Sequence, residues 1–423
     1  GVLVFLVFTG MRVVYAASLV GLGGLVAIVG WDAGAGIIGT IPHSKSVSYT
    51  LSVLPMFILI GFLAFHAGFT NAIFDAARKW IGWVTGGLAV ASVFAAAGFA
   101  AVSGASTATA AVFSRIAIPE MLKYGYDRKL AAGVVAAGGT LASLIPPSAI
   151  LVIYAVIVEQ SVGALLLAGF IPGIFSALIY VVMIIGMAKR NPESAPAVGG
   201  YSWAERFRAV PGTLPIVFVI GIIFSSLYLG WATPTEAGAL GAGVVFVVAL
   251  LHGMRWKSFQ EALLDTAKLT AMIFSIIWGV LAFVRFLGFA GLPEAFATWV
   301  VGLPLPPMLI MIGILLFYAV LGMFMDAIGM LLLTLPVVYP AVIALGFDPI
   351  WFGIIVVKMA EICLITPPIG LNCYVVNGVR PDIPLQDVFK GIAPFFVADV
   401  VTVGLLLAFP GIILWLPNLV MGS

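Results

Sequence analysis

The chain has 423 residues, of which 63% are hydrophobic and only 9% are charged. Soluble domains carry roughly 25% charged residues, so this composition lacks the polar surface that a water-soluble fold needs. The 19 basic and 17 acidic residues leave a net charge of +2, which provides no basic surface for nucleic acid. The composition therefore predicts an all-α protein that crosses a lipid bilayer many times.

Most of the chain consists of long apolar stretches. A spanning helix needs about 20 apolar residues. On this criterion we expect spans at 2–29, 49–69, 84–102, 128–145, 161–188, 213–231, 236–252, 269–290, 305–325, 349–365 and 392–416. Four shorter apolar pieces are bounded by Gly or Pro, at 104–122, 147–158, 327–344 and 367–379. Because non-helical backbone at membrane depth needs cover from protein or a water-filled cavity, these pieces are expected to form hairpins and broken helices beside a site.

Three polar connecting segments stand out between the apolar runs. Residues 70–83 place an apolar face opposite charged residues, a pattern that fits a helix along the membrane interface and an ordinary loop helix equally. Residues 189–212 are rich in basic residues and proline, which predicts a cytoplasmic linker. Capping-box patterns at Ser202 and at Ser258 predict a short helix after each, the second in a connector over 253–268.

The chain contains an internal repeat. One constant shift superposes the G-Y-D of 125–127 on the G-F-D of 346–348, and Pro146-Pro147 on Pro367-Pro368. A constant offset between several motifs indicates duplication of a structural unit. The predicted organisation is a first half over 1–188, the linker over 189–212 and a second half over 213–423.

Gly- and Pro-interrupted segments occupy matching positions in the two halves, which is the best sequence indicator of a transporter binding site. They are 103–109 with 145–148, and 322–326 with 365–372. Proline frees backbone carbonyl groups, and oxygen atoms replace the water shell of a hard cation. Exposed N–H groups at the start of a half-helix favour an anion. One fold with these two breaks can therefore hold a sodium ion and an anionic solute side by side.

Single charged residues in the apolar runs are candidates for function. Asp326 is costly at membrane depth and is expected to be linked to an ion; the alternative is a hydrogen-bond anchor for the hairpin. Lys358 and Glu361 lie three residues apart on one helical face and are expected to pair with each other. Arg285 and Glu159 lie near predicted helix ends, where such side chains reach towards water.

Four motifs, in this order along the chain, carry a resemblance to a known family: 125–128, 138–140 with 145–148, 232–237 and 365–372. Together they resemble the large membrane subunit (M-subunit) of tripartite ATP-independent periplasmic (TRAP) transporters of the C4-dicarboxylate type. The resemblance implies sodium-driven, elevator-type import of a small organic anion across the bacterial inner membrane. It also implies two partners, a small four-helix membrane subunit and a soluble periplasmic substrate-binding protein, which we expect to be separate polypeptides.

The resemblance also implies site residues. The first sodium site is expected at Ser103, Gly104, Ser106, Gly139 and Thr140. The second is expected at Gly322, Asp326, Gly329 and Thr366. Substrate contacts are expected at Ser148 and Asn372, which follow the two Pro-Pro pairs, and at Thr109. Many family members carry an aspartate where this chain has Thr109.

Three other functions are compatible with some of these features. A transporter working without a soluble receptor would share all of these features, and an ion channel would share the polar breaks. An intramembrane enzyme would need Asp326 and Glu361 to converge. The sequence contains no nucleotide-binding loop, metal-binding helix motif or nucleophile elbow, and the two cysteines form no zinc or disulfide pattern. We therefore expect neither enzymatic activity nor an organic cofactor, with sodium as the transported coupling ion.

Overall fold

The computed structural model describes residues 2–11 and 13–422, and all secondary structure in this part of the chain is helical. Six helical segments are long and apolar enough to cross a membrane. They are α10 (Val162–Arg190), the continuous segment of α11 and α12 (Trp203–Tyr228), α13 (Pro234–Leu251), α14 (Trp256–Phe289), α17 (Ala327–Ala344) and α20 (Leu385–Ala408). The chain is thus a multi-pass membrane protein, as its composition predicts.

Several expected spans are shorter than predicted. Four apolar helices have only 10–17 residues, namely α2 (Val13–Val29), α6 (Gly87–Ser103), α16 (Pro307–Gly322) and α21 (Gly411–Met421). The expected span at 128–145 ends as α8 (Arg128–Thr140), followed by a single 3-10 turn. The chain reverses after the hairpin helices and unwinds before each Pro-Pro pair, which shortens the regular helix on either side.

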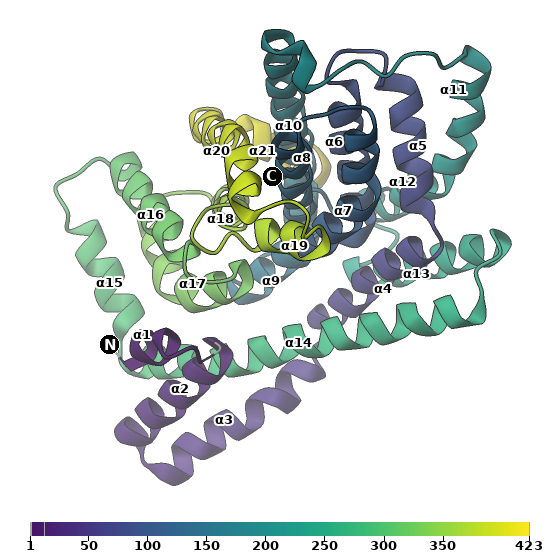
Figure 1. Cartoon of the computed structure of the whole chain (residues 1–423). Coiled ribbons are helices and arrows are strands. Elements are labelled where there is room, and N and C mark those ends of the chain that lie inside the picture. The colour runs from purple at the N-terminus through teal and green to yellow at the C-terminus, as the bar shows by residue number, and fades with distance from the viewer. Residues whose placement is uncertain (1, 12, 423) are drawn as a thin grey trace.

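The N-terminal region differs from its prediction. The expected span over 2–29 is divided into α1 (Val2–Phe8) and α2, and Gly10 between them has a φ of 87° that a helix does not tolerate. A further helix, α3 (Trp31–Ser46), covers residues with no predicted element. It precedes a 56° bend into the 3-10 turn and α4 (Val53–His66). In Figure 1, α2 and α3 lie at the lower edge of the molecule, whereas α4 lies above α14 beside α13.

The order of elements repeats along the chain. The first half contains α4, α5 (Phe69–Ile81), the hairpin of α6 and α7 (Ser106–Lys123), then α8, α9 (Ala149–Ile157) and α10. The second contains α14, α15 (Leu292–Val301), the hairpin of α16 and α17, then α18 (Pro349–Cys363), α19 (Leu371–Val379) and α20. Matching aspartates start α8 and α18: Asp127 accepts from two backbone N–H groups at 2.8 and 3.1 Å, and Asp348 from two at 2.8 Å.

The polar linker after α10 is attached to the first half. The N–H of Asp127 donates to Ser194 O at 2.9 Å, and that of Val198 donates to Gly82 O at 2.7 Å. The capping box at Ser202 is formed at the start of α11 (Trp203–Ala209), where Glu205 Oε2 accepts from the Ser202 N–H and hydroxyl, each at 2.8 Å. The linker is therefore held by hydrogen bonds to the start of α8 and to the end of α5.

The second predicted capping box is wrong. Helix α14 begins at Trp256 and continues through Ser258 to Phe289, so the expected connector at 253–268 is largely the first part of one 34-residue helix. No proline interrupts this stretch, and its helical pattern continues from the polar into the apolar part. In Figure 1, α14 runs beneath most of the helices, with α3 below it, and it packs on α2, α3 and α4.

Helix α5 forms where the amphipathic pattern predicts it. Its apolar residues Ile73 and Phe74 are buried, and the helix packs on α6 and α11. Its charged side pairs Asp75 with Arg78 at 2.8 Å and with Lys79 at 2.5 Å. The apolar face of α5 is therefore buried against protein, as expected for a helix between spans, and is not exposed to lipid.

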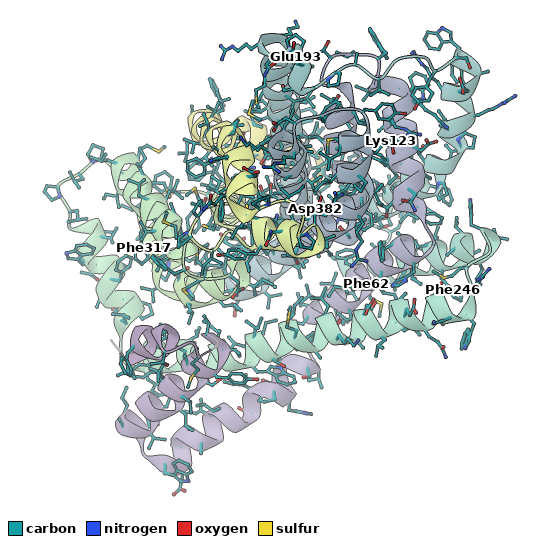
Figure 2. The ribbon with its side chains drawn as sticks, viewed as in Figure 1. Phe62, Lys123, Glu193, Phe246, Phe317 and Asp382 are labelled. Carbon is teal, nitrogen blue, oxygen red and sulfur yellow. The ribbon has the colours of Figure 1, made fainter. Side chains whose placement is uncertain are left out.

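The remaining helices form a bundle above α14, with side chains filling the space between them (Figures 1 and 2). One close crossing joins α8 to α20. A Cβ atom at Gly391 would lie 1.9 Å from Lys129 O, and one at Gly133 would lie 2.2 Å from Gly391 O. Small residues allow such close approach between membrane helices, where packing takes the place of the hydrophobic effect.

We expect Gly391→Ala to lower the melting temperature of the purified protein by several degrees, because the added methyl group forces α20 away from α8. Gly404→Ala on the same helix is the matched control, since a Cβ there would have no neighbour within 4 Å. Equal melting temperatures for the two variants would contradict the close crossing.

Candidate ion and substrate site

The tip of the first hairpin lies against the first break. Gly104 connects α6 to α7 with a φ of 57°, and a Cβ atom there would lie 2.5 Å from Pro147 O. The N–H of Ala149 donates to Gly104 O at 3.5 Å. The requirement for glycine at this position therefore arises from both the left-handed backbone and the close approach of the break.

Hydroxyl groups gather at this junction. Ser103 Oγ lies 3.0 Å from Thr109 Oγ1, and Ser106 Oγ lies 2.6 Å from Ser143 Oγ. Ser148 Oγ donates to Ser143 O at 2.5 Å and accepts from the N–H of Leu151, so it caps α9. Ser103, Ser106, Thr109 and Ser148 are all buried, and the cluster offers several oxygen atoms within a small volume.

The second half contributes an amide to this cluster. Asn372 lies in the first turn of α19 after the second break, and its Nδ2 donates to Ala136 O of α8 at 3.1 Å. A Cβ atom at Gly139 would lie 2.9 Å from Ser106 O and 3.1 Å from Asn372 Nδ2, so these three residues adjoin one another. Asn372 is fully buried, and its Oδ1 has no hydrogen-bond partner among the described residues. A buried acceptor without a donor is costly in an apolar setting and suits a cation.

Not all predicted residues of the first site point towards it. Thr140 Oγ1 donates to Ala137 O at 2.7 Å and lies 3.3 Å from the Tyr180 hydroxyl, so it faces α10. Ser103, Gly104, Ser106 and Gly139 line the junction itself. Sodium binding at these five residues stays a prediction.

The second hairpin is organised around Asp326. This aspartate caps α17, and its Oδ1 accepts from the N–H of Gly329 at 2.9 Å. A Cβ atom at Gly329 would lie 2.8 Å from Asp326 Oδ2, which explains the glycine there. The side chain thus anchors the hairpin, the alternative that the sequence left open, and its carboxylate is half-buried at the hairpin tip. Its link to an ion stays a prediction.

The second break packs against this hairpin. A Cβ atom at Gly322 would lie 1.7 Å from Cys363 Sγ, so α16 touches the end of α18 directly. Thr366 Oγ1 donates to Ile362 O at 2.6 Å, and the N–H of Asn372 reaches back to Leu364 O at 2.9 Å. Asn372 therefore connects the second break to the hydroxyl cluster of the first.

Two cavities adjoin these elements. The smaller, about 220 Å³, is mostly apolar and includes Ser103, Arg115 and the labelled Phe62 in its wall (Figure 2). The larger, about 810 Å³, lies between α3 and α14 on one side and α9 and α17 on the other. Its charged lining residues are Lys45, Glu159 and Arg285, and neither cation forms an ion pair with a described residue. Arg285 and Glu159 therefore both line this cavity.

Lys358 and Glu361 pair as predicted, with Nζ and Oε2 2.8 Å apart, and Asp399 of α20 joins them. Sequence reasoning missed Asp399, although it lies in an apolar run as Asp326 does. Asp326 and Glu361 have different partners, so the two acids do not converge as an intramembrane enzyme would require.

Comparison of the sequence with known proteins shows which family the chain belongs to. Residues 2–412 match the family described as tripartite ATP-independent periplasmic transporter, DctM component. The chain belongs to this family. It is 37% identical to the C4-dicarboxylate TRAP transporter large permease protein DctM of Pseudomonas aeruginosa over 88% of this chain and 87% of that protein. It is 31% identical to the sialic acid TRAP transporter large permease protein SiaM of Vibrio cholerae, over 89% of this chain and 88% of that one. The resemblance noted from the motifs is confirmed.

Two further comparisons define the breadth of the family and the fold. The ectoine TRAP transporter large permease protein TeaC of Halomonas elongata is 32% identical over 88% of this chain and 86% of that protein. The crystal structure of the Alcanivorax borkumensis YdaH transporter superposes with a TM-score of 0.57 at 14% identity, covering 91% of this chain and 90% of that one. The similarity to the YdaH transporter is one of fold alone. TRAP permeases are membrane transport components, which agrees with the absence of an enzyme motif.

We expect Asn372→Ala to weaken the stabilisation of the purified DctM-family chain by sodium, because the variant removes the buried Oδ1 acceptor. The measurement is the melting temperature in sodium relative to potassium at equal ionic strength. Asn377→Ala is the matched control, since Asn377 Nδ2 also donates to a backbone carbonyl, that of Ile383 at 2.8 Å, on the same helix. A full sodium response in Asn372→Ala would exclude this amide from the ion site.

Proposed function

We propose that this chain is the large permease subunit of a TRAP transporter that imports a small organic acid across the bacterial inner membrane, driven by sodium. The observation that carries the proposal is the junction of Ser106, Gly139 and Asn372. There, oxygen atoms from two repeated halves meet beside two helix breaks, and one of those oxygens has no donor. Sodium needs such an oxygen-rich, desolvated site, and unwound helices provide it in transporters.

The partners follow from the family. In this proposal a small four-helix membrane subunit binds the scaffold, and a periplasmic substrate-binding protein delivers the organic acid. The related proteins are named for C4-dicarboxylates, sialic acid and ectoine, so the receptor selects among small acids and related solutes. The permease then needs a general anion path and not a tailored pocket.

The transport step in this proposal is an elevator movement. The two hairpins with α8, α9, α18 and α19 form the moving domain, and α4, α5 and α14 belong to the scaffold. The 810 Å³ cavity lies between α14 and the helices α9 and α17, so it lies where the two parts separate. Lys45 and Arg285 give this opening positive charge, which attracts an organic anion.

Asp326 tests the coupling. We expect Asp326→Asn to abolish sodium-dependent uptake by proteoliposomes that contain the complete complex, while the melting temperature changes little. Asparagine preserves the N-cap of α17 but removes the charge. The matched control is Asp348→Asn, which makes the same change at another N-cap aspartate, that of α18, and is expected to retain uptake. Normal sodium-dependent uptake in Asp326→Asn would remove this carboxylate from the mechanism.

The cavity charges test the anion path. We expect Lys45→Ala and Arg285→Ala each to raise the substrate concentration for half-maximal uptake several-fold, and more at low salt than at high salt. Lys257→Ala is the control, since Lys257 lies on α14 but does not line this cavity. Unchanged half-saturation for both variants would place the anion path elsewhere.

The rival functions give different results in the same proteoliposomes. A transporter without a soluble receptor would take up the acid equally with and without the periplasmic protein. A channel would conduct without concentrating any solute against its gradient. Uphill uptake that requires both sodium and the receptor would support the proposal over both.

A further inference from the structure

A charged cluster is sealed inside the bundle. Lys358 Nζ lies 2.8 Å from Glu361 Oε2, 2.8 Å from Asp399 Oδ1 and 2.6 Å from Ser176 Oγ. All four residues have 0% exposure. They come from three helices that pack on one another, α10, α18 and α20.

The groups that surround these charged side chains are neutral, so they do not balance the net charge of the cluster. Tyr180 of α10 donates to Asp399 Oδ1 at 2.7 Å, and its hydroxyl lies 3.3 Å from Thr140 of α8. The backbone N–H of Leu144, just before the first break, faces the Glu361 carboxylate. Glu361 Oε1 and Asp399 Oδ2 have no hydrogen-bond partner among the described residues.

The charge count requires one more positive charge. Two ionised carboxylates and one ammonium group leave a net charge of −1. A net charge without contact to water is strongly unfavourable at low dielectric, and two carboxylates around one cation do not both ionise readily. Either a metal ion or a proton must compensate.

The cluster does not fit a metal ion. A hard cation takes about six oxygen ligands, whereas only two carboxylate oxygens here lack a partner. In the described part of the chain there is also no group of three His, Cys, Asp or Glu residues that could hold a metal. A proton needs only one of the two free oxygens.

We propose that the Lys358–Glu361–Asp399 cluster is a proton-binding site and that Glu361 holds the proton. Asp399 Oδ1 accepts from two side chains, Lys358 and Tyr180. Glu361 Oε2 accepts from one side chain, Lys358, and the nearby Leu144 N–H already donates to Leu141 O at 3.3 Å. Two charge-assisted hydrogen bonds stabilise an anion better than one, so the negative charge resides on Asp399. The cluster shares no residue with the sodium and substrate sites proposed above, but its Tyr180 hydroxyl lies 3.3 Å from Thr140 of the expected first sodium site.

The proton has a consequence for the bundle. Its release in alkaline solution leaves a net negative charge between α10, α18 and α20, next to the first break at Leu144. The unfolded chain releases this proton above the ordinary pKa of glutamate, about 4.3, whereas the folded chain keeps it. Stability should therefore be greatest below that pH and decline as the pH rises, until the folded chain also loses the proton. The proton site makes the bundle sensitive to alkaline pH through one carboxyl group.

The test uses the full chain with its small membrane subunit, measured from about pH 6 to about pH 9. Infrared spectroscopy of the wild type should show the carbonyl stretch of a buried protonated carboxyl group, and Glu361→Gln should lack it. The melting temperature of the wild type should fall with rising pH, whereas Glu361→Gln should stay level because glutamine imitates the neutral acid. Asp399→Asn, the matched control, should melt lower at every pH because it removes the anion.

Each alternative result overturns the proposal. Absence of a protonated carboxyl band in the wild type would mean that Glu361 is ionised, whatever the variants do. Failure of Glu361→Gln to fold, or an alkaline decline that persists in it, would contradict a neutral Glu361. A stable Asp399→Asn beside a destabilised Glu361→Gln would place the proton on Asp399 instead.

Discussion

The constraint that shapes this molecule is the cost of leaving polar groups unpaired in an apolar environment. A helix hides its backbone polar groups within itself, so every break needs cover from another part of the chain. Here the tip of the first hairpin, at Gly104, covers the first break, and Asn372 from the other half donates to Ala136 O near the end of the preceding helix, α8. The elements that form the site are therefore the same ones that make the breaks tolerable, and the duplication supplies both.

Glycines set the distances in this arrangement. Because Gly139 has no side chain, Ser106 and Asn372 can both lie next to it. In the same way Gly322 allows α16 to contact α18, and Gly133 and Gly391 allow α8 to contact α20. Close contact of this kind holds membrane helices together in place of the hydrophobic effect. It also keeps the oxygen atoms of the junction within reach of one small cation.

Much of this architecture could be predicted from the sequence, because proline and glycine mark the breaks and the repeat marks their equivalence. The contact between Asn372 and Ala136 joins residues 236 positions apart, and no local pattern encodes it. The direction of the Thr140 hydroxyl and the continuity of α14 through Ser258 also depend on packing. Asp399 had the same signal as Asp326, a lone carboxylate in an apolar run, and could have been found.

The central claim is that sodium and an organic acid cross together through the junction of the two halves. The most direct measurement is the flux of radioactive sodium into proteoliposomes that contain the complete complex. The proposal predicts that sodium enters only when the organic acid and its receptor are present, in a fixed ratio to the acid. Sodium entry without the acid, or uphill uptake of the acid without sodium, would contradict it.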